Sequence, residues 1–461
     1  MLPKKDILLL KHLLVHKKNE EIKTILAKLH PADIAEMLGE IKNVNKKIFL
    51  RLLDTEKAAE VLEELEPSER LTLIEDMTEA EIVKILENMS VDEIIDLFQE
   101  MPNRQVEKLL LRLPGSYYDE LKTLLKMAED TAGGLMTTDF VYLFSDITVS
   151  DAIDVVRQFG QDAETIYYLY VVDEAKHLMG VLSLRELISA PRHKKICDIM
   201  HKKVVSVDVG LDQEEVAKTI SKYSLLAVPV VDKQNRLLGI VTVDDALDVM
   251  EAEDTEDIHK MAGISPEEDV VLTSSIWGAS KKRIFWLVVC LLGDLLSGMV
   301  IDVYSGILQS VVAVAFFIPV LMATGGNVGT QSLALAVRGI ATGELNTKNL
   351  TAFIKEETLA GLNVGIICGL VLAVVAFIWQ KNIHLSMSVG ISMGIALMFS
   401  TFIGILIPML FNFLKIDPAV ASGPFITTVV DVCTLVIYFT FSMAFLSRFS
   451  GKLGPGFGPG I

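Results

Sequence analysis

Hydrophobic and polar positions follow a different pattern in each part of this chain. From residue 1 to about 128, apolar residues recur at helical spacing, as in ADIAEMLGEI and VDEIIDLFQEM, which predicts a domain of helices only. Between residues 129 and 252, short apolar runs alternate with polar turns, which indicates strands mixed with helices. From residue 276 on, apolar runs reach the length of membrane-spanning helices.

The first region is expected to be a stack of short helical hairpins. Several units open with a proline or serine beside acids, as at Pro31, Pro67 and Ser90, and these residues suit the first turn of a helix. The spacing of the units is irregular, so no named repeat is assigned. Asp92 and Asp96 lie four positions apart on one helix face, where either a cation or base separates them or the face is simply solvated.

An internal repeat occupies residues 129–252. The segment YLYVVDEAKHLMGVLSLREL is echoed 59 residues later by LAVPVVDKQNRLLGIVTVDDAL, and Gly180 matches Gly239. Each copy reads as strand, turn, strand and helix, and a methionine, Met136 or Met200, opens each one. This pattern resembles a tandem pair of CBS modules.

The CBS resemblance implies a ligand and a partner. Such pairs commonly bind adenine nucleotides between the two copies and often dimerise, although a pair can also be purely structural. The acid that opens the last helix of each copy tends to hold a ribose. That place is taken by Arg185 and Glu186 in the first copy and by Asp244 and Asp245 in the second.

An acidic helix, DDALDVMEAEDTEDIHKMAG, follows the repeat and contains no breaker before Gly263. Asp245 and Asp248 share one face of it, and further acids follow. A surface coil explains such a charge run more often than a metal site does. The segment 244–275 connects the repeat to the first apolar run, and a helical connection of this length would transmit force rather than act as a loose tether.

Five membrane spans are predicted in the domain 276–461, and their approximate bounds are 284–301, 308–337, 354–379, 386–411 and 422–446. The second is too long for one simple crossing, so we expect it to tilt or to extend past the bilayer. Basic residues favour a cytosolic N-terminus and an outside C-terminus by the positive-inside rule. One side carries Lys281, Lys282, Arg283, Arg338, Lys348, Lys355 and Lys415; the other carries Lys381, Arg448 and Lys452.

One carboxylate, Asp431, lies near the middle of the last span, SGPFITTVVDVCTLVIYFTFSMAF. A charge at that depth costs about 2.5–3.5 kcal/mol on insertion scales, so such a residue usually faces water or a partner. Asp431 either lines a cation path or is hydrogen-bonded to a neighbouring helix, with Thr427 or Thr428 as intermediaries. Asp294 in the first span is a second acid, and its role is open between pore residue, interhelical partner and cavity residue.

The second span contains the polar stretch ATGGNVGTQ. Gly325 and Gly329 form a small-xxx-small face, which close helix packing would explain. Packing does not explain Asn327 and Gln331 in the same stretch, and glycines also let backbone carbonyls approach an ion. The combination favours a lined pore over packing alone.

The composition shows that charge is distributed unevenly along the chain. Hydrophobic residues make up 51% of the 461 positions, and the net charge is −18. Only seven of the 60 acids but ten of the 42 basic residues follow position 280, so the first part carries −21 and the rest +3. An acidic soluble part repels nucleic acid and attracts cations. The four cysteines form no Cys-x-x-Cys pair, and the N-terminus has no signal-peptide pattern.

Together, these parts resemble the MgtE family of magnesium transporters over nearly the whole chain. The specific segments are ATGGNVGTQSLALAVRGIATGEL, KIDPAVASGPFITTVVDV, DAETIYYLYVVDE and TVDDALDVMEAEDTEDIHK. The resemblance implies a homodimer in the plasma membrane with a pore on the two-fold axis. It implies that Mg²⁺ is both transported and regulatory, and that the connecting helix acts as a plug.

The resemblance also implies sites. The pore residues would be Asp431 and Asn327, and nucleotide binding, with ATP as the regulatory ligand, would fall to Arg185 and Glu186. The acids expected to bind cytosolic Mg²⁺ are Asp92, Asp96, Glu214, Asp245, Asp248, Glu253, Glu256, Asp257 and Asp417. Ser224 stands where the family has an acid, so one cytosolic site is expected to be weaker or absent.

The predicted function is therefore a Mg²⁺ channel or transporter gated by cytosolic Mg²⁺. The sequence shows no phosphate-cradling loop for ATP hydrolysis, so we expect no enzyme. Two alternatives are a membrane-anchored CBS nucleotide sensor and a transporter of Co²⁺, Mn²⁺ or Ni²⁺. Oxygen ligands without His or Cys favour a hard cation.

Overall fold

The computed structural model forms two compact units, residues 1–252 and 253–461, and the boundary between them falls inside one helix. The structure describes residues 13, 16, 18–41, 46–65, 67–74, 77–161, 163–264, 276–345 and 349–446. Four predictions fall partly or wholly on other residues: the connecting segment beyond residue 264, and the basic positions Lys348, Arg448 and Lys452.

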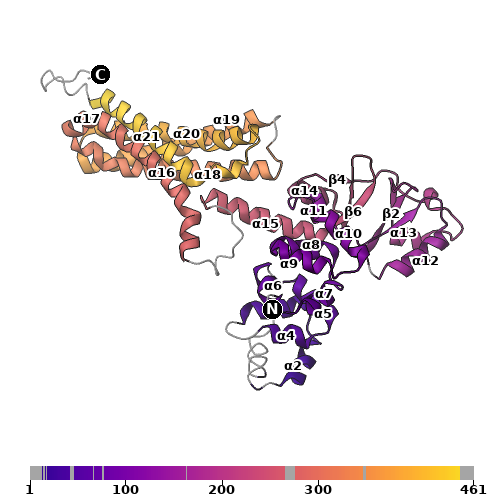
Figure 1. The fold of residues 1–461 in the computed structure, drawn as a ribbon. Helices are drawn as coiled ribbons and strands as arrows, with labels where there is room; N and C mark the ends of the chain where they lie inside the picture. The colour runs from indigo at the N-terminus through magenta and orange to yellow at the C-terminus, as the bar shows by residue number, and fades with distance from the viewer. Residues whose placement is uncertain are drawn as a thin grey trace. The chain divides into compact units, whose positions relative to one another are not determined.

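The first unit begins with short helices, as the periodicity predicts (Figure 1). Their bounds are α2 Asn19–Leu26, α3 Pro31–Glu40, α4 Lys47–Leu52, α5 Thr55–Glu63, α6 Pro67–Ile74, α7 Glu79–Leu86, α8 Val91–Glu100, α9 Asn103–Leu110 and α10 Gly115–Leu124. Thr78 caps α7 with a reciprocal bond to Glu81, and α3 and α6 open on their prolines.

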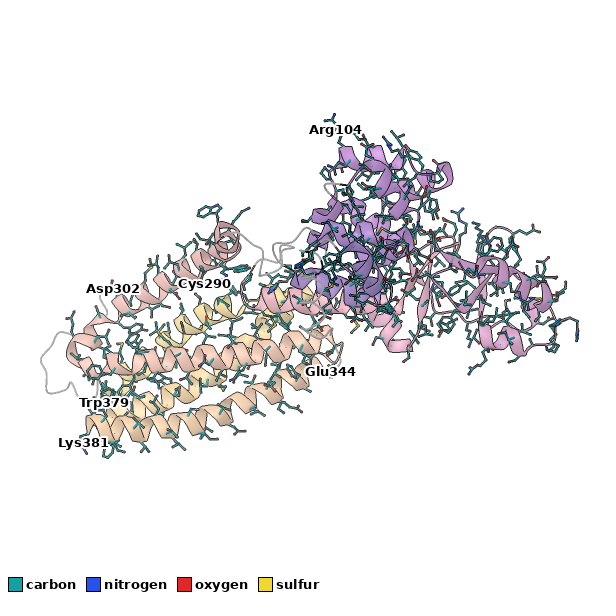
Figure 2. All side chains as sticks on the ribbon, turned by 90° about the horizontal axis from the view of Figure 1, so that it is seen from below. Arg104, Cys290, Asp302, Glu344, Trp379 and Lys381 are labelled. Carbon is teal, nitrogen blue, oxygen red and sulfur yellow. The ribbon has the colours of Figure 1, made fainter. Side chains whose placement is uncertain are left out.

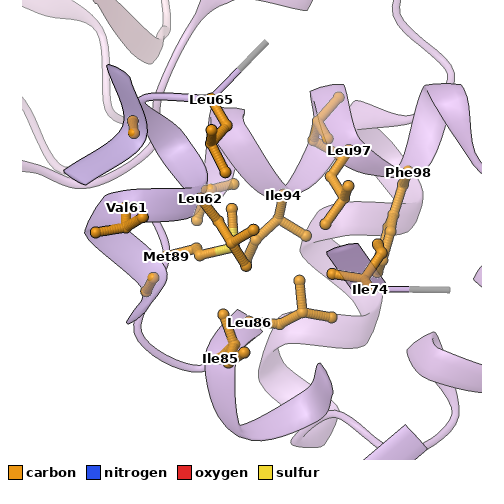
Figure 3. Packing of buried hydrophobic residues seen from close by; sticks show 14 of the residues in the cluster. Val61, Leu62, Leu65, Ile74, Ile85, Leu86, Met89, Ile94, Leu97 and Phe98 are labelled. Atoms are coloured by element: carbon orange, nitrogen blue, oxygen red, sulfur yellow. The ribbon is translucent and has the colours of Figure 1, made fainter. Parts of the chain in front are cut away.

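A continuous apolar core joins these helices (Figure 3). Helix α8 illustrates its origin, because Ile94, Leu97 and Phe98 recur at helical spacing and are all buried. In Figure 3, Leu86 and Met89 from the neighbouring turn point into the same cluster. The polar face of α8 is left free to carry Asp92, Glu93 and Asp96, so the core positions the acids discussed below.

The second part of this unit has two three-stranded sheets of identical topology. Their orders are β1-β2-β3 and β4-β5-β6, with a parallel first pair and an antiparallel second pair in each. The elements are α11 Ala132–Leu135, β1 Phe140–Phe144, α12 Val149–Phe159, β2 Thr165–Val172, β3 Leu178–Ser183, α13 Leu184–Ser189, η1 Ile196–Asp198, β4 Val207–Asp208, α14 Gln213–Tyr223, β5 Ala227–Val231 and β6 Leu237–Thr242.

The matched glycines of the repeat occupy matched positions. A side chain at Gly180 would collide with Met200 and the carbonyl of His201, and one at Gly239 would collide with Met136 and the carbonyl of Thr137. Met200 opens the second copy and Met136 opens the first, so each copy's glycine accommodates the segment that opens the other copy. The internal repeat predicted from sequence is therefore a structural repeat.

Helix α15, Val243–Met261, follows β6 and carries the acidic run. It ends where the sequence predicts, because Gly263 adopts a positive φ of 70° and the amides of Gly263 and Ile264 return to the carbonyls of Lys260 and His259. Residues to Ala252 belong to the first unit, and residues from Glu253 belong to the second.

The second unit is a bundle of long apolar helices (Figure 1). Among the residues that the structure describes, five segments are long and apolar enough to cross a membrane. The helices are α16 Ile276–Val303, α17 Ser305–Ser310, η2 Val312–Phe317, α18 Ile318–Ala341, α19 Leu350–Gln380, α20 Ile383–Phe413, η3 Pro418–Val420 and α21 Gly423–Leu446. In Figure 2, Asp302 and Lys381 lie toward one end of this bundle and Glu344 toward the other.

The second predicted span is interrupted. Residues 308–337 do not form one continuous helix: the segment contains the end of α17, the 3-10 turn η2 and most of α18. Pro319 in the first turn of α18 is the physical reason, since proline suits a helix start but not a helix interior. The segment 305–317 therefore precedes α18 as a separate short helix and a 3-10 turn, with Val314 and Phe317 fully buried.

Candidate cation sites

Asp431 lies on α21 and is only half-buried within this chain. The hydroxyls of Thr427 and Thr428 donate to the carbonyl of Pro424, at 2.8 and 3.0 Å, and not to Asp431. Within the described residues, no hydrogen bond or ion pair engages the Asp431 carboxylate. The alternative in which the threonines satisfy this acid therefore has no support in the structure.

The glycines of α18 pack against α21. A side chain on Gly325 or Gly329 would press on Val430, and one on Gly326 would press on Thr427. Packing therefore accounts for these glycines, as the small-xxx-small pattern allows. Asn327, in contrast, is exposed on the surface of this chain.

The contacts of α18 also set the height of Asn327. Gly325 meets Val430 and Thr434, and Gly329 meets Ile426 and Val430, so the two helices run antiparallel. This register places Asn327 within about one helical turn of Asp431 along α21. Both predicted pore residues therefore lie at one level of the bundle.

A first group of acids gathers in the first unit, where α8 meets the start of α15. Burial, and then the neighbouring carboxylates, raise the pKa of Asp92 and of Asp245 to about 6. Desolvation and nearby acids also raise the pKa of Asp96 and Glu164, although both side chains keep solvent contact. Asp92, Asp96 and Asp245 were predicted site residues, whereas Glu164 was not.

One oxygen of this group lacks a partner. Asp92 Oδ1 is buried, and no described residue donates a hydrogen bond to it. A buried carboxylate oxygen without a donor is costly unless a cation or a proton satisfies it. The observation fits a hard dication, for which carboxylate oxygens are preferred ligands.

A buried arginine accompanies the acids, and no sequence pattern predicted it. Arg70 is 8% exposed and donates to Glu93 Oε2 and to the carbonyls of Glu63 and Leu65. Burial raises the pKa of the Glu93 carboxyl, and the Arg70 guanidinium opposes that rise. Asp96 also interacts electrostatically with Arg70. The acid group is therefore only partly compensated by the protein itself.

Two other predicted acids of this unit, Asp248 and Glu214, differ from this group in their exposure or their partner. Asp248 is exposed on α15, where desolvation and the neighbouring Asp244 raise its pKa. Glu214 forms an ion pair of 2.8 Å with Lys218 on its own helix, α14. Ser224 ends α14 in a left-handed conformation with φ 52°.

A second group lies in the second unit, at the end of α15. Lys260 Nζ is 2.6 Å from Glu256 and 2.5 Å from Asp417, so the lysine bridges the two predicted acids. Met261 joins an apolar cluster with Val337 and Ile426 from α18 and α21. The predicted Glu253 and Asp257 are half-buried on the same stretch of α15.

The described acids are numerous, but they are spaced too widely for several of them to bind one metal ion directly. Within the described residues, no three His, Cys, Asp or Glu side chains lie close enough together to hold one metal ion. Mg²⁺ usually keeps several waters and takes only one or two carboxylates. The two groups therefore fit ion binding through water-mediated contacts in the arrangement seen here.

The predicted nucleotide residues lie at the start of α13. Glu186 accepts bonds from the Ser183 amide and hydroxyl, both at 2.8 Å, and lies 2.7 Å from His201 Nε2. The His201 bond and the Ser183 amide lower the pKa of Glu186 to about 2. Arg185 beside it is exposed.

A cavity of about 160 Å³ lies elsewhere in this unit, between α10 and the strands. Its lining residues are Glu120, Thr138, Phe140, Tyr142, Val172, Lys176, Leu237 and Leu238. Neither Arg185 nor Glu186 lines it. The cavity therefore does not bear on the predicted nucleotide site.

The chain matches three family descriptions in sequence order. Residues 29–130 match "MgtE intracellular N domain", residues 132–193 and 196–252 match "CBS domain", and residues 318–441 match "Divalent cation transporter" of MgtE.

Curated relatives extend the similarity over most of the chain. The magnesium transporter MgtE of Bacillus subtilis is 36% identical over 93% of this chain and 95% of its own length. That of Thermus thermophilus is 38% identical, over 90% of this chain and 93% of its own length. The magnesium transporter MgtE of Enterococcus faecalis is 42% identical over 72% of this chain and 72% of its own length.

Two solved structures resemble the first unit. The cytosolic domain of the Mg²⁺ channel MgtE in complex with ATP is 38% identical, with a TM-score of 0.51, and aligns with 53% of this chain and 99% of its own. The soluble part of a magnesium transporter is 35% identical, with a TM-score of 0.50, over 54% of this chain and 98% of its own.

Proposed function

This chain belongs to the MgtE family of magnesium transporters, and from that premise we propose that it is a Mg²⁺-selective channel gated by cytosolic Mg²⁺. It is a multi-pass membrane protein with a helical domain, a CBS pair and five spans. The observation that carries the proposal is Asp431: a carboxylate on a membrane-spanning helix that no described residue satisfies. A hydrated dication that visits it would supply the missing compensation.

The pore chemistry follows from the hydration of Mg²⁺. This ion dehydrates reluctantly, so a pore that keeps the water shell and contacts it with few oxygens avoids most of the dehydration cost. Asp431 supplies charge, and the exposed Asn327 supplies an amide at the same level. In a homodimer both residues would be doubled about the axis, which would attract a dication while leaving it mobile.

Gating is proposed to act through α15. When cytosolic Mg²⁺ is plentiful, ions neutralise the acids at Asp92 and Asp245 and the acids toward the end of the helix, and the domains draw together. When Mg²⁺ falls, the carboxylates repel one another and the assembly loosens. This is a two-state equilibrium biased by differential ion binding.

The contact between α15 and α21 supports this coupling. Lys260 bonds to Asp417, and Gly263 lies against Pro424 at the start of α21. Pro424 precedes Asp431 by seven residues, a rise of about 10 Å along one helix. A displacement of the end of α15 would therefore act directly on the helix that carries the pore carboxylate.

ATP is proposed as a regulatory ligand of the CBS pair. The support is the ATP complex named for the similar cytosolic domain. Arg185 is exposed for a phosphate, and Glu186 is held in place by Ser183 and His201 for a ribose. We further propose a cytosolic N-terminus and an outside C-terminus in the plasma membrane, from the distribution of basic residues.

Mg²⁺ uptake into proteoliposomes with an internal Mg²⁺ dye tests the transport proposal. Asp431→Asn should reduce the initial rate at least about tenfold, because one charge in a low-dielectric passage is removed. Asp302→Asn is the matched control, since it removes an exposed acid from the end of a neighbouring span and should leave the rate unchanged. Absence of flux in the wild type would favour a nucleotide sensor, and a panel with Co²⁺, Mn²⁺ and Ni²⁺ tests selectivity.

Limited proteolysis tests the gating proposal. The full chain should be protected by millimolar Mg²⁺, and the double variant Asp248→Asn with Asp257→Asn should need a higher Mg²⁺ concentration. Asp254→Asn, an exposed acid on the same helix, is the control. An unshifted protection curve in the double variant would contradict the proposed role of α15.

A further inference from the structure

Helix α16 carries a second mid-membrane carboxylate, Asp294, which the family assignment leaves without a role. Asp294 is exposed on the protomer surface, and within the described residues no hydrogen bond or ion pair engages it. Its position, near the middle of the span Arg283–Val303, excludes satisfaction by interfacial water. Contact with lipid at that depth would be costly, so this face is expected to meet water or another polar group.

The register between α16 and α21 locates Asp294. A side chain on Gly293 would collide with Thr428, and the rings of Tyr304 and Phe439 stack with centroids 5.0 Å apart. Both pairs are separated by the same 135 positions, so the two helices run parallel and in constant register. At this offset of 135 positions, Asp294 lies at the same height along the helix axes as Val429.

Two residues of α21 correspond to about 3 Å of rise, so Asp294 and Asp431 lie at nearly one height. The two carboxylates also lie close enough to interact electrostatically. Like charges at this depth repel each other strongly, because the low dielectric does not screen them. The pair is therefore stable in its charged form only where a cation or water reaches both.

An unsatisfied hydroxyl points to a ligand at the same place. Ser297 is 4% exposed, and its Oγ has no hydrogen-bond partner among the described residues. Several other hydroxyls on the described spans bond to the carbonyl four residues before them, as do Thr324, Ser400 and Thr440. Ser297 does not do so, and neither does Ser392 on α20.

The register places Ser297 beside the two carboxylates. It follows Gly293 by four residues, so it lies on the face of α16 that meets α21. By the same offset it lies level with Val432, about 1.5 Å in height from Asp431. Three oxygen-bearing groups from two neighbouring helices therefore lie within one helical turn of one another in height.

We propose that Asp294 and Ser297 complete, with Asp431, an oxygen-lined site for a hydrated divalent cation between α16 and α21. This proposal rests on the proposed function, because it places the site on the path marked by Asp431. Asp294 supplies a second negative charge, which raises the affinity for a dication over a monovalent ion. Ser297 supplies a neutral oxygen to the ion's water shell.

The test measures Mg²⁺ uptake against external Mg²⁺ concentration in proteoliposomes of the full chain. Asp294→Asn should raise the half-saturating Mg²⁺ concentration about tenfold, which corresponds to ~1.4 kcal/mol. Ser297→Ala should raise it about twofold to threefold, as expected for loss of one neutral hydrogen bond. Asp302→Asn, the other acid of α16, should leave it unchanged.

A second readout separates ion binding from helix packing. Hexaamminecobalt(III), a rigid mimic of the hydrated ion, should block uptake, and Asp294→Asn should raise the blocking concentration about tenfold by losing one charge contact. Asp294→Glu, which keeps the charge, should retain block. A variant that only loosened packing would lower the rate without moving either concentration.

The outcomes are distinguishable from failure of the proposed function. Wild-type protein without flux, or full flux in Asp431→Asn, would overturn the transport proposal itself. Flux that depends on Asp431 but has the same half-saturation and block in Asp294→Asn would overturn this inference alone. If Asp294→Asn does not assemble, an unchanged half-saturating Mg²⁺ concentration in Ser297→Ala overturns it equally.

Discussion

At the scale of single residues, charge compensation distinguishes acids that are available to bind an ion from acids that stabilise the fold. Asp92 Oδ1 is buried without a donor, whereas the neighbouring Glu93 has Arg70. An acid left without a partner in the protein is available to an ion, and an acid with a partner contributes to the fold. Arg70 therefore belongs to the framework, although it lies among candidate ligands.

Replacement of Arg70 tests that distinction. Arg70→Met leaves Glu93 buried without its cation and the carbonyls of Glu63 and Leu65 without a donor, so it should lower the free energy of unfolding of this domain by about 3–5 kcal/mol. Urea unfolding of the detergent-solubilised chain, followed by circular dichroism, measures the change.

Arg104→Met is the matched control for that experiment. Arg104 is exposed and projects from the surface in Figure 2, so its loss should change stability by no more than about 0.5 kcal/mol. Equal losses of unfolding free energy in the two variants would show that the buried Arg70–Glu93 pair stabilises the domain no more than an exposed arginine does.

At the scale of helices, close backbone contacts hold the membrane unit together. A Cβ on Gly365 would meet the carbonyl of Gly394 at 2.5 Å, and a Cβ on Gly390 would meet the carbonyl of Gly369 at 2.8 Å. Helices α19 and α20 therefore approach each other through their glycines, as expected where apolar burial cannot drive association within lipid.

A one-carbon change tests this contact. Gly365→Ala should destabilise the unit by about 1–3 kcal/mol, because the rigid backbone opposite cannot yield to the new methyl group. Gly298→Ala, where nothing lies within 4 Å, is the control and should be neutral or stabilising. Thermal aggregation in detergent, followed by size-exclusion fluorescence, measures both; a neutral Gly365→Ala would contradict the close contact.

The same scale shows what sequence patterns can predict. Each of the five apolar runs contains a long helix, because length and hydropathy are local properties. The break before Pro319 was not predicted, since the apolar residues before it carry the same composition as the helix that follows. Asp431 and Asn327 stood out as polar groups in apolar surroundings. The proximity of Asp294 to Asp431 was not predictable, because it depends on the register between two helices.

At the scale of the whole molecule, the acid group makes stability depend on pH and Mg²⁺ together. Burial and nearby carboxylates raise the pKa of Asp92 and Asp245 to about 6, above the value near 4 expected in the unfolded chain. Between these values the folded state binds more protons than the unfolded state. Stability therefore falls as pH rises from about 4 through 6 when no divalent ion is present.

Thermal unfolding at several pH values measures this linkage. In EDTA the melting temperature of the first unit should fall between pH 5 and pH 7.5. Mg²⁺ should raise it more at pH 7.5 than at pH 5, because the ion binds the deprotonated carboxylates. Asp92→Asn with Asp245→Asn should flatten both dependences. A Mg²⁺ effect that is equal at the two pH values would contradict binding at these acids.

The exchange of methionines between the two CBS copies has a consequence for ancestry. Met136 fills the space above Gly239, and Met200 fills the space above Gly180, so neither copy completes its own surface. A single copy alone would leave an unfilled groove beside its glycine and a methionine side chain with nothing to pack against. A single-module precursor is therefore expected to have paired with a second molecule, and gene duplication would have joined two partners that were already interlocked.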